Sequence, residues 1–82
     1  MIEDKVKELV EKVLLEKGIR IDSIKYEKEG NNNFLRIVVD RDKPIDVDTI
    51  VDITKIINPL LDETDIIKDS YILDVSSMEK GE

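Results

Sequence analysis

The chain has 82 residues, enough for one domain built around a single hydrophobic core. It contains neither cysteine nor histidine, which excludes disulfides, thiolate nucleophiles, imidazole bases and metal sites built from either residue. The formal net charge is −7 and arises in the second half, because residues 1–43 carry equal numbers of acids and bases. Negative charge repels nucleic-acid phosphates and attracts basic partners, while the plainer alternative is that the acids only keep the domain soluble.

The first predicted element is an amphipathic helix over about residues 2–17. Glu3 and Lys7 lie four residues apart on its charged outer face, with the acid first, which supports a helix. Gly18 predicts the C-terminal stop. The apolar residues recur at the three- and four-residue spacing of one helix face: Ile2, Val6, Leu9, Val10, Val13 and Leu14. We expect this face to cover the core rather than to bind a partner.

A hairpin should follow the first helix. A strand is predicted over residues 20–29, with Ile24 and Tyr26 on one face. Glycine and asparagine in residues 30–33 tolerate the positive φ angles of a turn. The second strand is predicted over residues 34–40, and its apolar, β-branched composition indicates the centre of the sheet. Leu35, Ile37 and Val39 should face one way, with Phe34, Arg36 and Val38 on the other side.

A second helix and a third strand complete the domain. Asp46 or Asp48 can cap the helix, because a carboxylate accepts hydrogen bonds from the free amides of the first turn. Pro59 removes one backbone donor, so we expect a kink or an early end there. Acids crowd the expected C-terminal end, where they oppose the helix dipole; this marks either a functional surface or merely the start of a loop. The third strand is predicted over residues 71–75.

These elements define an α+β fold with the order α-β-β-α-β. Both helices should pack on one face of a three-stranded mixed sheet of order 1-2-3, with strands 2 and 3 parallel after a right-handed crossover. The opposite face would then expose Phe34, Val38 and Ile72, which makes it a candidate docking surface. We predict a domain over residues 1–77 and a disordered tail over residues 78–82.

Residue patterns typical of catalysis are scarce in this sequence. The glycine-rich phosphate-binding motifs GxxxxGK[ST] and GxGxxG do not occur in the sequence. Ser76 and Ser77 have no histidine to activate them as nucleophiles. Asp46, Asp48 and Asp52 lack the glycine and the closing glutamate of a calcium loop, so they are expected to serve as caps and solvated side chains. We therefore predict no catalytic, cofactor or metal site. No apolar run approaches 18 residues and no signal peptide is recognised, so we expect a cytoplasmic protein that does not enter membranes.

Five segments, in order, resemble the N-terminal domain of the ribosome maturation factor RimP family. An amphipathic helix leads into Ile-Lys-Tyr-Glu at residues 24–27, and a Gly/Asn turn precedes Phe-Leu-Arg-Ile-Val-Val-Asp at residues 34–40. Ile-Asp-Val-Asp at residues 45–48 is similar to the family's start of the second helix. Residues 58–65 resemble its Leu-Leu-Asp-Glu segment, and Tyr-Ile-Leu-Asp-Val-Ser-Ser at residues 71–77 resembles its signature in the last strand. The resemblance covers nearly all of residues 1–77.

The resemblance implies a non-catalytic role in ribosome assembly. RimP-like proteins bind the immature small ribosomal subunit, with a ribosomal protein of the S12 type as a contact, and any contact with rRNA would be indirect. The family continues after the double serine with Pro-Gly and an SH3-like barrel. Met-Glu-Lys stands at residues 78–80 instead, so no function of the barrel is carried over.

Six residues are the candidate partner-binding set. Four of them are carboxylates expected to meet lysine or arginine of a partner: Asp62, Glu63, Asp65 and Asp74. Their contribution should be to steering and register more than to affinity. The other two, Ser76 and Ser77, are expected to cap the strand end or to orient a neighbouring domain. Two alternatives remain open. A KH-like RNA-binding domain would need a GxxG loop, which this sequence lacks. A homodimerising structural module would use the bare sheet face or an edge strand, whereas we expect a monomer.

Overall fold

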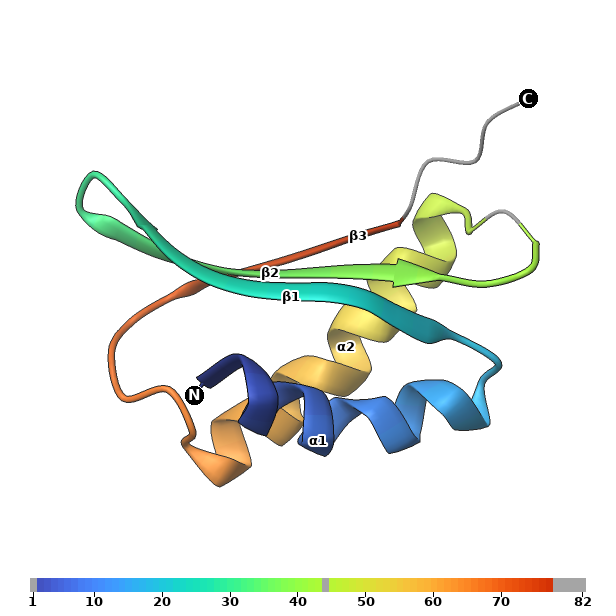
Figure 1. Ribbon diagram of the computed structural model, residues 1–82, viewed down its shortest axis with the longest axis horizontal. Helices are drawn as coiled ribbons and strands as arrows, with labels where there is room; N and C mark the ends of the chain where they lie inside the picture. The colour runs from blue at the N-terminus through green and yellow to red at the C-terminus, as the bar shows by residue number, and fades with distance from the viewer. Residues whose placement is uncertain (1, 44, 78–82) are drawn as a thin grey trace.

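Two helices cover one face of a three-stranded sheet in the computed structural model (Figure 1). The structure describes residues 2–43 and 45–77; the predicted tail and Pro44 lie outside them. β1 and β2 are antiparallel, β2 and β3 are parallel, and the strand order is β1-β2-β3, as predicted. The α+β fold and its element order are confirmed: α1 (Ile2–Glu16), β1 (Arg20–Glu29), β2 (Asn32–Asp40), α2 (Val47–Thr64) and β3 (Ile72–Ser77).

The hydrophobic core lies between the helices and the sheet. The central strand β2 contributes Leu35, Ile37 and Val39, which are all fully buried, while the alternating residues of β2 point to the other face. Every buried residue among those described is aliphatic, and no polar side chain is buried with them. The core therefore depends on aliphatic packing alone: Val6, Val10, Leu14, Ile19, Leu35, Ile37, Val39, Ile53, Ile57, Leu61 and Ile67.

Helix α1 ends in a glycine C-cap, one residue before the predicted end. Gly18 has a φ of +73°, a conformation that favours glycine. Its N–H donates to the carbonyl of Leu15, and the N–H of Ile19 donates to the carbonyl of Leu14 at 2.9 Å. This pair of bonds forms a Schellman motif, and the buried side chains of Leu14 and Ile19 join the core beside it. The cap thus turns the chain directly into β1.

The β1–β2 turn is shorter than predicted. Glu29 pairs with Asn32, so only Gly30 and Asn31 form the loop, and β2 begins two residues earlier than the sequence indicated. Gly30 has a φ of +60° and Asn31 does not have a positive φ, the pattern of a type II′ hairpin. Such a turn matches the strand twist, and the ladder therefore extends to the loop. A register shift near Ile21 marks a β-bulge in β1.

Helix α2 begins at an aspartate cap and continues past its proline. Asp46 is the N-cap, and its Oδ1 accepts a hydrogen bond from the backbone N–H of Thr49 at 2.8 Å. The predicted early end at Pro59 is wrong, because the helix runs on to Thr64. Pro59 and Lys55, whose carbonyl loses its donor, are both exposed, so water can satisfy that carbonyl.

Replacing Asp46 by alanine should destabilise the domain in a pH-dependent way. Hydrogen bonds from the side chain and backbone of Thr49 lower the pKa of the Asp46 carboxyl below its ordinary value. A lowered folded-state pKa means that the charged cap stabilises at neutral pH and that this contribution is lost as the pH falls through the folded pKa. The difference in melting temperature between the wild type and D46A should therefore shrink below about pH 4, measured by circular dichroism. A difference that stays constant down to about pH 2.5 would show that the carboxylate charge is unimportant.

Candidate protein-binding surfaces

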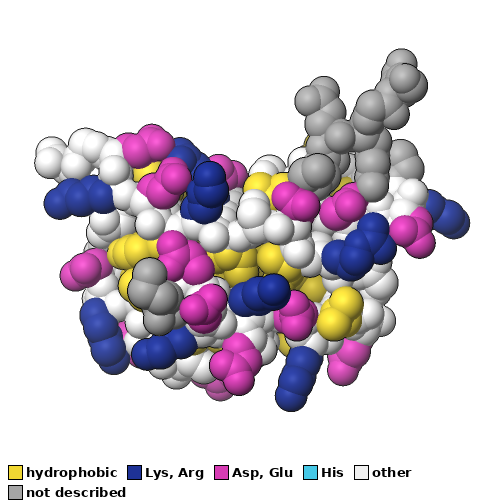
Figure 2. All heavy atoms as spheres, in the orientation of Figure 1, with side chains coloured by type: hydrophobic (Ala, Val, Ile, Leu, Met, Phe, Trp, Pro, Cys, Tyr) yellow, Lys and Arg dark blue, Asp and Glu magenta, His cyan; other side chains and the backbone are white. Residues whose placement is uncertain are grey.

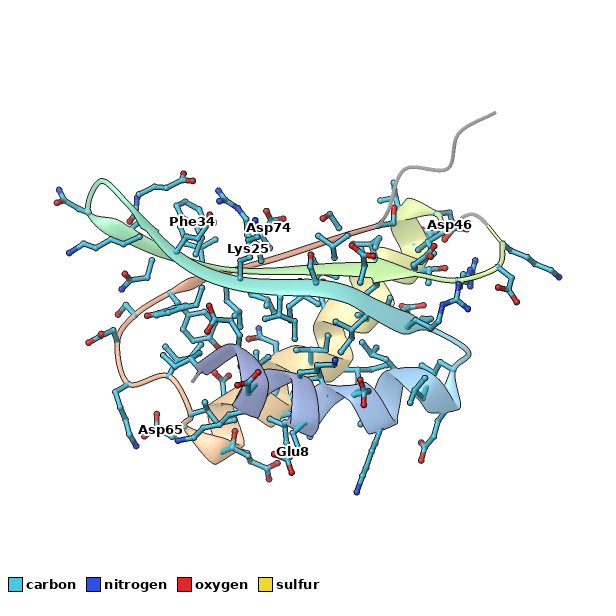
Figure 3. The ribbon with its side chains drawn as sticks, in the orientation of Figure 1. Glu8, Lys25, Phe34, Asp46, Asp65 and Asp74 are labelled. Atoms are coloured by element: carbon cyan, nitrogen blue, oxygen red, sulfur yellow. The ribbon has the colours of Figure 1, made fainter. Side chains whose placement is uncertain are left out.

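The sheet face opposite the helices is organised around Arg36 on the central strand. Arg36 Nη1 donates to Glu27 Oε2 at 2.7 Å and to Glu29 Oε1 at 2.9 Å on β1, and Arg36 Nε lies 3.6 Å from Asp74 Oδ2 on β3. Its guanidinium carbon lies 4.9 Å from the centroid of the Phe34 ring. Figure 3 shows Phe34 and Asp74 on this side of the sheet. One arginine therefore links all three strands across this face.

Asp74 belongs to the Arg36 cluster, which consists of Arg36, Glu27, Glu29 and Asp74. Asp74 was predicted to meet a basic partner, and it lies beside Arg36 of the same domain, since these residues are directly opposite in the parallel register. Hydrogen bonding and charge from Arg36 also lower the pKa of the Glu29 carboxyl. The Arg36 and Asp74 side chains remain 32% and 52% exposed, so the pair is accessible to solvent and its net contribution to stability is small.

Replacing Arg36 by glutamine should lower the melting temperature most at low salt. Three carboxylates, on Glu27, Glu29 and Asp74, would then face one another without a cation, and their repulsion is screened as the Debye length falls from about 10 Å at 0.1 M to about 3 Å at 1 M salt. The effect should be measured as melting temperature at both salt concentrations. The matched control is K28Q, which removes one exposed cation from β1 outside this cluster. If R36Q and K28Q lowered the melting temperature equally and independently of salt, Arg36 would not be neutralising the three carboxylates.

The C-terminal end of α2 carries the other predicted carboxylates. Asp62 and Glu63 lie in its last turn, are exposed, and have no basic residue beside them in that turn. Asp65 is the C-cap in the left-handed conformation (φ 50°, ψ 40°), and its N–H donates to the carbonyl of Leu61. The Asp65 carboxylate lies 2.9 Å from Lys68 Nζ. Of the three acids at this end of α2, Asp65 therefore has a cation paired with it, Lys68.

A groove lies between α2 and the start of β3. It has a volume of about 460 Å³, and its acids, Asp62 and Asp69, come from α2 and from the loop before β3. Desolvation and the nearby Asp62 charge raise the pKa of the Tyr71 phenol above its ordinary value. Asn33 Nδ2 donates to the carbonyl of Ser70 at 3.1 Å, which ties the loop to β2. The lining residues are Thr54, Asn58, Asp62, Asp69, Ser70, Tyr71 and Leu73.

The structure divides the six predicted residues between two faces. Ser76 is exposed on the Arg36 side of β3, opposite Val38, and Asp74 lies on the same side. Ser77 is half-buried opposite Val39, whose side chain belongs to the helix-covered face. Figure 3 shows Asp65 at the far end of α2, away from Asp74 and on the helix side of the sheet. Asp62, Glu63 and Asp65 therefore form one acidic end, to which Asp74 and Ser76 do not belong.

Sequence reasoning missed Asp69 and Tyr71 as members of the same site. Both precede β3, and the chain reversal after α2 brings them beside Asp62. The run of acids after Leu61 was the available signal, but it could not show which acids would face the groove. Figure 2 shows one face of the molecule, where basic and acidic side chains are interspersed rather than segregated. Charge alone therefore does not select a single surface.

Other site classes find no support among the described residues. No group of three or more acidic side chains there is arranged to hold a metal ion. Within residues 2–43 and 45–77, no buried side-chain polar atom lacks a hydrogen-bond partner. Neither helix is long and apolar enough to cross a membrane. Gly18 ends α1 and Gly30 forms the hairpin turn, so neither belongs to a nucleic-acid-binding GxxG loop.

Together, the fold and these surfaces define a small acidic α+β domain with two helices on one sheet face and an accessible opposite face. The sequence matches the RimP N-terminal domain family over residues 9–78. The chain therefore belongs to this family, as the resemblance in its motifs predicted. RimP is a family of ribosome maturation factors and not a known enzyme family.

Proposed function

We propose that this domain acts in maturation of the small ribosomal subunit in the cytoplasm, by binding the immature particle through a basic ribosomal protein without catalysing a reaction. The observation that carries the proposal is the RimP N-terminal domain match, which covers residues 9–78. The expected contact is the ribosomal protein of the S12 type implied by the motif resemblance, and rRNA is contacted at most indirectly.

The acidic end of α2 supports a basic protein partner. Asp62, Glu63 and Asp65 gather at one helix end, where the partial negative charge of the helix dipole adds to theirs. Such a field accelerates encounter with a cationic protein and disfavours bare nucleic acid, whose phosphates have the same sign. The contribution is to rate and register, because exposed ion pairs add little affinity.

Sedimentation with ribosomal particles tests the proposal. The tagged chain should cosediment with immature small subunits more strongly than with mature ones, and raising the salt from about 0.1 to 0.5 M should weaken this binding. Purified basic ribosomal protein should bind the chain directly, and protein-free rRNA should not compete. Absence of the chain from all particle fractions at low salt would overturn the proposal. If the chain bound protein-free rRNA and this binding weakened steeply with rising salt, the RNA-binding alternative would instead be favoured.

A further inference from the structure

The two edges of the sheet differ in how they are protected. An unpaired strand edge presents free backbone N–H and C=O groups, and proteins commonly block such edges with bulges and lysines. The β1 edge has both devices, a bulge near Ile21 together with Lys25 and Lys28. β3 contains no lysine, no proline and no bulge in its pairing with β2. Among the described residues, only β2 pairs with β3, so its outer edge is open.

The open β3 edge borders the acidic groove. Leu73 of β3 and Tyr71 just before it form one wall, and Asp62 of α2 and Asp69 of the preceding loop supply the charge. Neither acid has a hydrogen bond or ion pair with a described residue that would neutralise it, in contrast to Asp65 and Asp74. On the other side of the strand, Ile72 is 46% exposed. The strand edge thus has an acidic flank and an apolar flank.

We propose that the outer edge of β3 binds an extended basic peptide segment as a fourth strand, with lysine or arginine side chains in the groove that contains Asp62 and Asp69. In an added strand, alternate side chains point to opposite faces, so basic residues at every second position would face the groove. The remaining side chains would lie beside Ile72. This inference rests on the proposed function, since it identifies how a basic protein partner is recognised.

The charge of the chain selects this occupant over a second copy. Joining two β3 edges would bring together two domains that each carry a net charge of −7, and like charges oppose such pairing. A cationic strand removes that repulsion while satisfying the same backbone groups. Every second residue of β3 directs its N–H and C=O outward, so the bound segment gains main-chain hydrogen bonds without requiring a specific sequence.

Two octapeptides of equal charge separate strand addition from simple attraction. The probe is Lys-Val repeated four times. The control is Lys-Pro repeated four times, in which proline replaces each valine and has no backbone N–H to donate. Titrated into the ¹⁵N-labelled chain, the Lys-Val peptide should shift amides of residues 72–77 and slow hydrogen exchange of alternate amides there at least about tenfold. The Lys-Pro peptide should leave that exchange unchanged. Equal effects of the two peptides, or no effect on β3, would overturn the inference.

Matched variants test the groove. D62N/D69N should weaken Lys-Val binding about fivefold, because two attractive charges are lost. E8Q/E16Q makes the same change in net charge on α1, where both acids are exposed and outside the groove, and should bind as the wild type does. Equal affinities of the two double variants would overturn the groove assignment. Protection of β3 amides that grows with protein concentration and without peptide would make a second copy the occupant and overturn the basic-peptide assignment.

The particle experiment separates the two proposals. If the chain cosediments with immature small subunits while the Lys-Val peptide leaves β3 unaffected, strand addition is wrong and the proposed function stands. If the peptide adds to β3 but no particle binds, β3 is a peptide-binding edge and the ribosomal role is wrong.

Discussion

Reversing the charge at the acidic end of α2 (Asp62, Glu63 and Asp65) should abolish most binding to small-subunit particles while leaving the domain folded. The variant D62K/E63K/D65N uses asparagine at position 65, because that residue has a positive φ and asparagine tolerates it. Lysines in the last turn also favour the helix dipole, so the melting temperature should be unchanged or higher. The variant removes three negative charges and adds two positive ones at one helix end, so binding to immature small subunits should fall at least about tenfold at about 0.1 M salt.

A matched variant keeps this result interpretable. E11Q/E16K/D52K makes the same change in net charge at positions outside the acidic end of α2, with Glu11 and Glu16 on α1 and the exposed Asp52 near the start of α2. It should retain most particle binding, measured by sedimentation in the same gradients. Equal losses in both variants would mean that net charge alone controls binding. Full retention in D62K/E63K/D65N would remove the carboxylates of α2 from the interface and leave the family role untouched.

The largest expected stability loss is at Ile37, in the centre of the sheet. Ile37 is fully buried and is paired with Ile24 on one side and Val75 on the other. Replacing it by alanine should cost about 2–5 kcal/mol through lost burial and the cavity left behind. An 82-residue domain has only roughly 4–12 kcal/mol of total stability, so I37A should be marginally folded or unfolded at 37 °C.

Urea unfolding followed by circular dichroism measures this loss. I37V, which removes one methyl group, should cost about 0.5–1.5 kcal/mol and remain folded enough for a full curve. The neighbouring V38A is the control, because Val38 is only half-buried on the other sheet face, and it should cost less than I37A. A larger loss in V38A than in I37A would show that the two faces of β2 are assigned the wrong way round.

Local patterns were sufficient to predict the elements and their faces. The three- and four-residue spacing of α1 placed Val6, Val10 and Leu14 correctly in the core, and the alternation of β2 did the same for Leu35, Ile37 and Val39. Ile2 and Leu9 of the same helix face are only partly buried against the core. Boundaries were less accurate where two local signals competed. The Asn residues at 31–33 suggested a longer turn than the two-residue loop, because asparagine is also accommodated in a strand when cross-strand pairing favours it.

Pro59 shows how the tertiary structure outweighs a local preference. The proline removes a hydrogen bond, but Ile57 and Leu61 on either side of it are buried in the core. Their burial favours continuation of the helix, and both Pro59 and Lys55 remain exposed to water. A sequence pattern reveals the lost donor, whereas the compensating packing exists only in the folded domain.

From its sequence alone, this chain could be recognised as an acidic α+β domain of the RimP N-terminal type, because periodicity, turn residues and ordered motifs are local properties. The tertiary structure decided which charges meet. Arg36 pairs with Asp74 across parallel strands, and Asp62 and Asp69 share a groove beside Tyr71. These contacts depend on strand register and on the path of the chain around α2. Both follow from packing between distant segments, which no local pattern specifies.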